Sequence, residues 1–385
     1  MRGRRLRQGA AAVALLLAIG CTGETSGSSG SPARPGSTPT GVATQPGSSS
    51  PTATAGGSAA PTSTAVRVAG TVAERLTAPW GVAFLPDGTA LVAERDSGHV
   101  VHLTGAGQSD AGTVPGVAAA GEGGLLGLAV PADFNRDHWV YAYLTTAQDN
   151  RIVRLRWDGN RLGAPHTVLD GLPKGFVHNG GRIAFGPDGY LYAGVGETGL
   201  RGQAQDRAAL GGKILRITAD GRPAPGNPFP GSPVYSWGHR NVQGLAWDSR
   251  GRLWATEFGQ DTWDELNLIK PGKNYGWPVV EGKAQRAGFT DPVVQWHPAE
   301  ASPSGLAYWH GSLWAAGLRG QRLWQIPLHA DGTSGAPQAH FTGKYGRLRT
   351  VAAAPDGSLW VTTSNTDGRG NPAPQDDRVL RLTAP

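Results

Sequence analysis

The sequence predicts an all-β fold, a six-bladed β-propeller, over residues 66–385. The first observation is a short pattern that occurs six times: Gly or a similar residue, an apolar residue, Ala and a second apolar residue. The second is the spacing of the copies, about 45 to 62 residues, which is the range of propeller blades. The third is a glycine content of 59 in 385 residues, without the three-residue period of collagen. The copies begin at Gly81, Gly127, Arg182, Gly244, Gly305 and Thr350.

Residues 1–21 have the pattern of a bacterial targeting signal. A positively charged start with Arg2, Arg4, Arg5 and Arg7 precedes an apolar run that is too short to span a bilayer. The run ends in small residues followed by Cys21, as in a lipobox. We therefore expect an exported lipoprotein of the cell surface or periplasm-facing membrane, anchored only through a lipid on Cys21. An ordinary secretory signal is the alternative, and Arg4-Arg5 leaves a twin-arginine route open.

Residues 22–65 consist mainly of Gly, Ser, Thr, Pro and Ala, with almost no large apolar side chain. Such a segment cannot bury enough apolar surface to offset the entropy of ordering the chain. We predict a disordered tether between the anchor and the propeller.

Charge and cysteine content exclude several classes of protein. The four arginines of the signal account for +4 of the net charge of +6, so cleavage leaves a protein close to neutral. No nucleic-acid partner is therefore expected. A single cysteine excludes a disulfide framework and a cysteine-rich metal site.

Turn signals follow most copies of the repeat. Pro-Asp-Gly at 86–88, 187–189 and 355–357 and Ser-Arg-Gly at 249–251 each precede a second apolar strand. Asp-Gly between two apolar segments is a strong hairpin signal. Each blade then has an inner strand followed by a hairpin. Chemistry is expected on loops at one mouth of the central channel.

Polar side chains occur where the inner strands begin. His178 lies just before the third copy of the repeat, and Arg240 and Asn241 lie before the fourth. Arg347 and Arg349 stand at alternate positions, so in extended chain they share a face and can bind carboxylates or phosphates together. A hydrogen-bonded loop histidine and a solvated arginine edge are the alternatives. The turn at Gly259 and Gln260 has carbonyls beside carboxylates, which suits a hard cation such as calcium.

Five segments, in order, resemble the soluble pyrroloquinoline-quinone (PQQ)-dependent glucose/sorbosone, or aldose sugar, dehydrogenase family. They are GEGGLLGLAVPADF, HNGGRIAFGPDG, GHRNVQGLAW, DELNLIKPGKNYGWP and GRLRTVAAAPDG. The resemblance covers about residues 70–385. It implies a six-bladed propeller, in agreement with the repeat count.

The resemblance also implies roles for individual residues. His178 matches the catalytic base, and Arg240 matches a residue that stabilises charge during the reaction. The carbonyls of Gly259 and Gln260 match ligands of calcium. The implied contacts of PQQ are Glu122, Arg240, Asn241, Trp296, Arg319, Arg347 and Arg349.

The implied function is oxidation of the anomeric carbon of an aldose to a lactone. His178 would take the hydroxyl proton, hydride would pass to calcium-bound PQQ, and an external acceptor would receive the electrons. Two alternatives remain: a non-enzymatic propeller that binds carbohydrate or a cell-wall partner, and a calcium-dependent lactonase. Val177 stands where the glucose enzymes have Asp, so the sequence does not specify the sugar.

Overall fold

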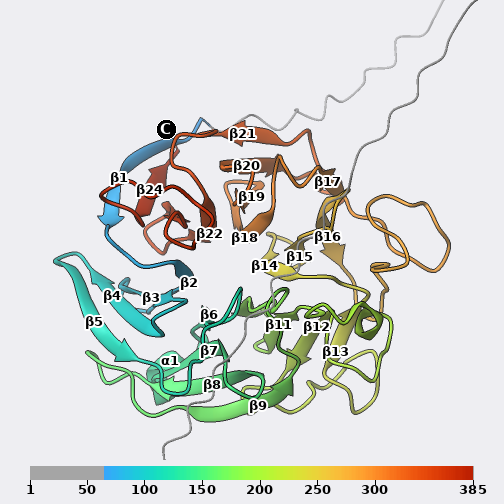
Figure 1. Cartoon of the computed structure of the whole chain (residues 1–385), viewed down its shortest axis with the longest axis horizontal. Helices are drawn as coiled ribbons and strands as arrows, with labels where there is room; N and C mark the ends of the chain where they lie inside the picture. The colour runs from blue at the N-terminus through green and yellow to red at the C-terminus, as the bar shows by residue number, and fades with distance from the viewer. Residues whose placement is uncertain (1–64, 385) are drawn as a thin grey trace, which may run out of the picture. The chain divides into compact units, whose positions relative to one another are not determined.

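The computed structural model describes residues 65–384, which form six four-stranded antiparallel sheets around a central channel (Figure 1). The predicted all-β, six-bladed propeller is therefore confirmed. The signal at 1–21, Cys21 and nearly all of the tether at 22–65 lie outside the described residues and stay predictions. No helix of residues 65–384 is long and apolar enough to cross a membrane.

Each of the first five blades consists of four consecutive strands, which follow one another from the channel outward. Blade 1 comprises β2 (Pro79–Phe84), β3 (Ala90–Glu94), β4 (His99–Thr104) and β5 (Gly107–Thr113). Blade 2 comprises β6 (Leu125–Ala129), β7 (Trp139–Thr145), β8 (Asn150–Arg156) and β9 (His166–Leu172). Blade 3 comprises β10 (Ile183–Phe185), β11 (Leu191–Val195), β12 (Lys213–Ile217) and β13 (Val234–Trp237).

The remaining blades follow the same plan. Blade 4 comprises β14 (Val242–Trp247), β15 (Leu253–Glu257), β16 (Asp264–Ile269) and β17 (Val294–Trp296). Blade 5 comprises β18 (Pro303–Trp309), β19 (Ser312–Gly317), β20 (Arg322–Pro327) and β21 (Gln338–His340). Two short helices lie in loops, α1 (Phe134–Asp137) and the 3₁₀-helix η1 (Arg201–Ala204).

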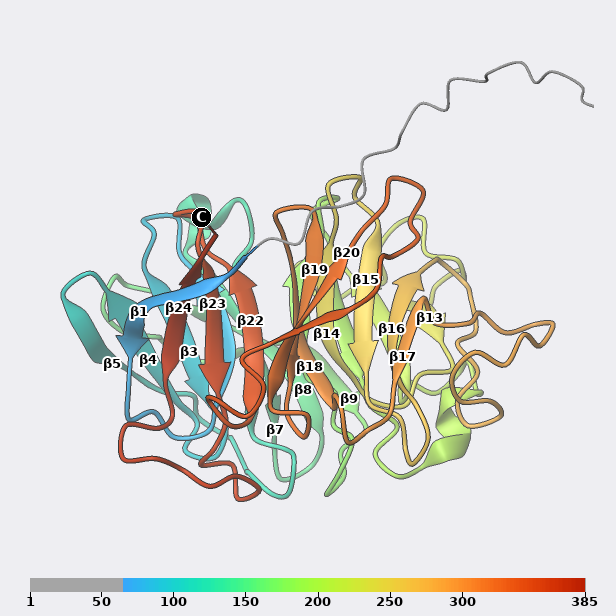
Figure 2. The ribbon, with the colours of Figure 1, turned by 90° about the horizontal axis from the view of Figure 1, so that it is seen from above.

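Blade 6 joins the two ends of the described chain. It comprises β22 (Leu348–Ala353), β23 (Leu359–Thr363), β24 (Val379–Thr383) and, as outer strand, β1 (Arg67–Ala73). Arg67 pairs with Thr383 and Ala73 with Val379, so the first strand closes the ring through backbone hydrogen bonds (Figure 2). Closure of this kind leaves only short, protected sheet edges.

The six copies of the repeat begin at or next to the innermost strand of each blade, and close packing explains their glycines. A Cβ on Gly81 would lie 2.4 Å from the carbonyl oxygen of Leu126, and one on Gly127 would lie 2.3 Å from that of Gly181. The missing side chain thus allows neighbouring inner strands to approach one another. The apolar positions of the repeat pack between blades, for example Leu128 between blades 1 and 2. Burial of each such side chain contributes about 1.5–3 kcal/mol.

The Asp-Gly turns form as predicted. In the first of them Gly88 has a φ of 84°, and the Asp87 carboxylate accepts the backbone N–H of Thr89 at 2.9 Å. Glycine adopts this left-handed conformation without a steric penalty. Because these turns lie at one end of the sheets, the loops that precede the inner strands lie at the other end (Figure 2).

Candidate functional site

Polar side chains gather at the mouth of the channel where the inner strands begin, which we call the entry mouth. His178 precedes β10, Arg240 and Asn241 precede β14, and Glu122 precedes β6. Arg349 lies in β22. The loops before the inner strands therefore bring together residues that are far apart in the sequence, as predicted.

His178 is held in a defined orientation by a buried carboxylate. Its Nδ1 lies 2.5 Å from Oε1 of Glu197, whose side chain is 1% exposed, whereas the His178 side chain is 17% exposed. A carboxylate on Nδ1 fixes the ring tautomer and leaves Nε2 as the proton acceptor. Its backbone has a φ of 55°, and a Cβ on Gly196 would overlap its carbonyl oxygen. Glycine at 196 therefore makes room for this strained loop.

Glu122 supports the same histidine from blade 2. Its Oε2 accepts a hydrogen bond from the backbone N–H of His178 at 2.8 Å. Its Oε1 accepts a hydrogen bond from Nη1 of Arg369 at 3.0 Å. Burial by itself would raise the pKa of Glu122, but the His178 N–H and the charge of Arg369 outweigh it and lower that pKa. Glu122 is therefore ionised at neutral pH, next to the histidine.

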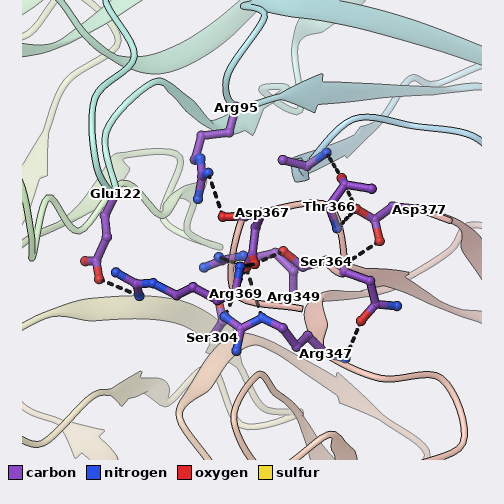
Figure 3. A network of polar contacts seen from close by, with 12 residues as sticks. Arg95, Glu122, Ser304, Arg347, Arg349, Ser364, Thr366, Asp367, Arg369 and Asp377 are labelled. Atoms are coloured by element: carbon purple, nitrogen blue, oxygen red, sulfur yellow. Dashed lines mark hydrogen bonds and ion pairs between the residues drawn. The ribbon is translucent and has the colours of Figure 1, made fainter. Parts of the chain in front are cut away.

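Arg347 and Arg349 meet on one carboxylate, that of Asp367 (Figure 3). Nε and Nη2 of Arg347 lie 3.1 and 3.0 Å from Oδ2 of Asp367, and Nη2 of Arg349 lies 3.4 Å from the same oxygen. Although burial acts against it, Arg349 and Arg347 lower the pKa of Asp367. The two arginines thus share a face, as their alternate positions predict.

Arg95 adds a third guanidinium near Asp367, since its Nη2 donates to the Asp367 carbonyl at 3.3 Å (Figure 3). Burial lowers the pKa of Arg349 to about 9, and the charges of Arg95 and Arg347 act in the same direction. Arg95 also binds the carboxylate of Asp96, at 2.6 and 3.0 Å, so these three guanidinium groups face two carboxylates. A bound anion would relieve this imbalance.

Blade 4 positions Arg240 through a second histidine–glutamate pair. Nδ1 of His239 lies 2.9 Å from Oε1 of Glu257, and Oε2 of Glu257 accepts the backbone N–H of Arg240 at 2.9 Å. Nη1 of Arg240 donates to the Phe258 carbonyl at 3.1 Å. The guanidinium lies 5.3 Å from the ring of Trp277. Backbone and side chain of Arg240 are thus both fixed.

Several buried polar atoms at this mouth have no hydrogen-bond partner within residues 65–384. They include Nε of Arg240, Nδ2 of Asn241, Nε of Arg349 and Oε2 of Glu197. An unsatisfied buried donor or acceptor costs about 1–3 kcal/mol, so such groups usually have a ligand or water as partner. Three of the four are donors, which indicates a ligand rich in acceptor oxygens.

Comparison with known proteins identifies the family. The sequence model of the "Glucose / Sorbosone dehydrogenase" family matches residues 76–373. This chain belongs to the glucose/sorbosone dehydrogenase family. Aldose sugar dehydrogenase YliI of Escherichia coli is 31% identical over 333 residues, which cover 77% of this chain and 89% of that protein. Quinoprotein glucose dehydrogenase B of Acinetobacter calcoaceticus is 32% identical over 260 residues, or 57% of this chain and 54% of that protein.

A solved structure is more similar still. The PQQ-bound aldose sugar dehydrogenase of Streptomyces coelicolor is 60% identical, with a TM-score of 0.83. The match covers 85% of this chain, about the extent of the propeller, and 100% of the Streptomyces chain. The resemblance inferred from the five motifs is therefore confirmed.

In this family member, the turn at Gly259 and Gln260 lies beside Arg240. The N–H of Gly259 donates to Asp264 at 2.9 Å, and that of Gln260 donates to Glu281 at 2.7 Å. Both N–H groups are thereby paired with carboxylates. Over residues 65–384 no cluster of three or more His, Cys, Asp or Glu side chains is placed to hold a metal. A cation here would depend on backbone carbonyls.

The last two predicted residues are Trp296 of blade 4 and Arg319 of blade 5. Trp296 belongs to β17, the outer strand of blade 4, where it is 5% exposed and packs in the core, its ring 5.8 Å from that of Trp324. Trp296 pairs with Asp264 of β16, and its part in cofactor binding stays a prediction. Trp277 is the aromatic residue against Arg240, with its ring centre 5.3 Å from the guanidinium. Arg319 has an exposed side chain. Its neighbour in the sequence, Leu318, borders the same cavity as Arg349.

Sequence reasoning missed Glu197, Asp367 and Arg369. Glu197 had one local signal, since it lies two residues after the apolar strand β11. This strand pairs with β10, which follows His178. Asp367 and Arg369 lie in a loop of blade 6 with no recognisable pattern. Asp367 meets Arg347 and Arg349 within blade 6, whereas Arg369 meets Glu122 of blade 2 only when the ring is closed.

Proposed function

We propose that this protein is a PQQ-dependent aldose sugar dehydrogenase that oxidises the anomeric carbon of an aldose to a lactone. The observation that carries the proposal is the pairing of His178 with Glu197 beside the unpartnered nitrogens of Arg240, Asn241 and Arg349. A base and a set of anion-binding donors thus share one channel mouth. The similar aldose sugar dehydrogenases, one of them solved with PQQ bound, support PQQ and an aldose as ligands.

The residues of the entry mouth fit PQQ. This cofactor carries three carboxylates, and at the mouth the Nε donors of Arg240 and Arg349 lack a partner within residues 65–384. Arg347 and Arg349 would hold carboxylates, while Arg240 and Asn241 would contact the quinone oxygens. Arg319 would reach a further carboxylate from its exposed loop. When bound, PQQ supplies the acceptor for the two electrons that leave the sugar.

Calcium fits the turn at 259–260 through the two backbone carbonyls. With both N–H groups bonded to carboxylates, the turn is held in one conformation next to Arg240. Carbonyl oxygens are ligands that calcium accepts readily. The ion would supply Lewis-acid polarisation of an oxygen at the site.

The chain's own residues account for the proton transfer. Nε2 of His178 accepts the proton of the anomeric hydroxyl as the C1–O bond becomes a carbonyl. Buried Glu197 stabilises the resulting imidazolium and keeps the ring from turning. Glu122 holds the backbone of His178 in place. Arg240 stabilises negative charge that develops on oxygen.

The electrons taken from the sugar would then pass from the reduced cofactor to an external acceptor.

We further propose that the protein is exported and held at the bacterial surface by a lipid on Cys21, with residues 22–65 as tether. A palmitate-labelling experiment with a Cys21→Ser variant tests this part separately. Label on the variant would contradict it.

Reconstitution tests the function. Purified protein is titrated with PQQ in calcium chloride, followed by absorbance, and then assayed for dye reduction with several aldoses. We expect saturable cofactor binding and aldose-dependent dye reduction. The absence of both would refute the proposal.

A substitution at the base separates binding from catalysis. His178→Ala should lose at least about 100-fold in turnover and still bind PQQ, because general-base catalysis contributes about 10²–10⁴-fold. His99→Ala, in the half-exposed outer part of blade 1, is the matched control and should keep full activity. Sugar binding without turnover in every form would instead favour a non-enzymatic propeller.

A further inference from the structure

Arg182 stands at a repeat position where four of the six blades have glycine. The equivalent residues are Gly81, Gly127, Gly244, Gly305 and, in blade 6, Thr350. The glycines have no side chain to extend into the channel. Arg182 and Thr350 do, and they come from blades on opposite sides of the ring.

The Arg182 side chain spans the channel. Its Nε donates to the Gln243 carbonyl of blade 4 at 2.8 Å, and its Nη2 donates to Oγ1 of Thr350 at 3.0 Å. Its guanidinium lies 4.3 Å from the ring centre of Trp80 in blade 1. Contacts with three other blades hold this group at the waist of the channel.

Within the described part of the chain, the charge of Arg182 has no counter-ion. The residue is 9% exposed, and no carboxylate within residues 65–384 lies within 4.0 Å of its nitrogens. The positive charge of Arg349 repels it. Burial together with Arg349 lowers the pKa of Arg182 to about 9. A buried cation without a counter-ion is costly, so an external anion would stabilise it.

Arg182 also borders a cavity of about 430 Å³ at the mouth opposite His178. We call it the exit-mouth cavity; it is bordered by the last residues of the inner strands and, at the waist, by Arg182 and Thr350. None of the four glycines at the same level borders it, which indicates that the two side chains form its floor. Four of its six rim residues are aromatic, Phe84, Phe185, Trp247 and Tyr308, and the other two are Val130 and Ala353.

We propose that the exit-mouth cavity is a second binding site, for a small anion with an apolar body, such as an aromatic or short-chain carboxylate. The carboxylate would pair with Arg182, and the apolar body would lie among the repeat alanines and the aromatic rim. Cavities of this size with an apolar lining and one convergent charge are typical of small-molecule sites. The site is independent of the entry mouth and of the proposed dehydrogenase activity.

Calorimetric titration of the full chain with benzoate, benzyl alcohol and acetate tests the proposal. We expect benzoate to bind with 1:1 stoichiometry and roughly tenfold or more tighter than benzyl alcohol, which has the same ring without the charge. Acetate, which has the charge without the ring, should bind more weakly than benzoate. Equal binding of benzoate and acetate would reveal an unspecific anion effect and overturn the proposal.

Variants locate the site. Arg182→Met should reduce benzoate binding to the level of benzyl alcohol, and Arg222→Met, whose side chain is 77% exposed, is the matched control. Because Arg182 also braces the channel, Ala184→Leu provides a second variant, which fills the cavity from its lining without removing the cation. It should weaken benzoate binding at least tenfold.

The entry mouth also contains arginines, so Arg349→Met discriminates between the two mouths. Benzoate binding that survives this substitution and is lost in Ala184→Leu supports the proposal. Binding lost in Arg349→Met but retained in Ala184→Leu places the anion at the entry mouth and overturns it.

Discussion

At the scale of single residues, His178 is oriented by carboxylates from two blades. Glu197 of blade 3 holds its ring, and Glu122 of blade 2 holds its backbone. Only Glu122 is in turn bound by an arginine, Arg369 of blade 6. The ring and the backbone of the base are therefore controlled by different groups, which substitutions can separate.

Replacement of Glu197 by Gln should impair catalysis more than cofactor binding. The amide cannot stabilise the imidazolium, and loss of such an orienting partner typically costs roughly 10- to 100-fold in activity. Steady-state dye reduction together with a PQQ titration measures both properties. Glu74→Gln, at a position whose side chain is 45% exposed, is the control. Unchanged turnover in Glu197→Gln would show that the pair has no catalytic role.

Asp367 gives the protein an acid-dependent part of its stability. Because its pKa in the folded state lies below the ordinary 3.8, its contribution is present above about pH 4 and is lost as the pH falls through the folded value. Asp367→Asn should cost about 3–5 kcal/mol at pH 7, since two buried arginines lose their carboxylate. Below pH 4 the difference from the wild type should narrow.

Denaturant unfolding at several pH values checks this expectation. The exposed Asp133→Asn is the control and should show little difference from the wild type at any pH. A difference for Asp367→Asn that stays constant down to low pH would contradict the assigned pKa shift.

At the scale of elements, the loops before the inner strands need support of their own. The loop with η1 packs around Lys213, a fully buried residue at the start of β12. Its Nζ donates to the carbonyls of Gln203, Gly211 and Ala204 at 2.6, 2.7 and 3.2 Å. One ammonium group thus joins three loop carbonyls, two of which, those of Gln203 and Ala204, also accept a backbone N–H from Asp206 and Gly238.

Lys213→Met should therefore destabilise the protein by roughly 2–5 kcal/mol, because the substitution keeps the side-chain volume and removes three hydrogen bonds of a buried charged donor. Thermal unfolding measures the loss. Lys273→Met, at an exposed position, should leave the midpoint unchanged. Equal midpoints for wild type and Lys213→Met would show that water replaces the ammonium group.

At the scale of the whole molecule, the ring depends on β1. This strand is the only one of blade 6 that comes from the N-terminal side of the chain, and it covers the edge of β24. The same closure fixes the distance between blades 6 and 2, which the Arg369–Glu122 ion pair bridges at 3.0 Å. Ring closure and site geometry are thus linked.

A chain that starts at Glu74 lacks β1 and should unfold at least roughly 10 °C lower than one that starts at Ala65. The reason is the loss of a full antiparallel strand pair and the exposure of the β24 edge. Calorimetry of both chains compares them directly. Similar midpoints would mean that the other three strands suffice to close the ring.

The sequence by itself determined the number of blades, the hairpin turns and the chemical types at the entry mouth. These features depend on local patterns: glycines where inner strands approach, Asp-Gly turns, and polar residues just before an inner strand. Only the tertiary structure decided which side chains meet. Glu197 and His178 are 19 residues apart, and Arg369 and Glu122 are 247 apart. The contact of Trp277 with Arg240 is a further example, since it joins two loops of blade 4 whose approach depends on the folded sheet and is encoded by no local pattern.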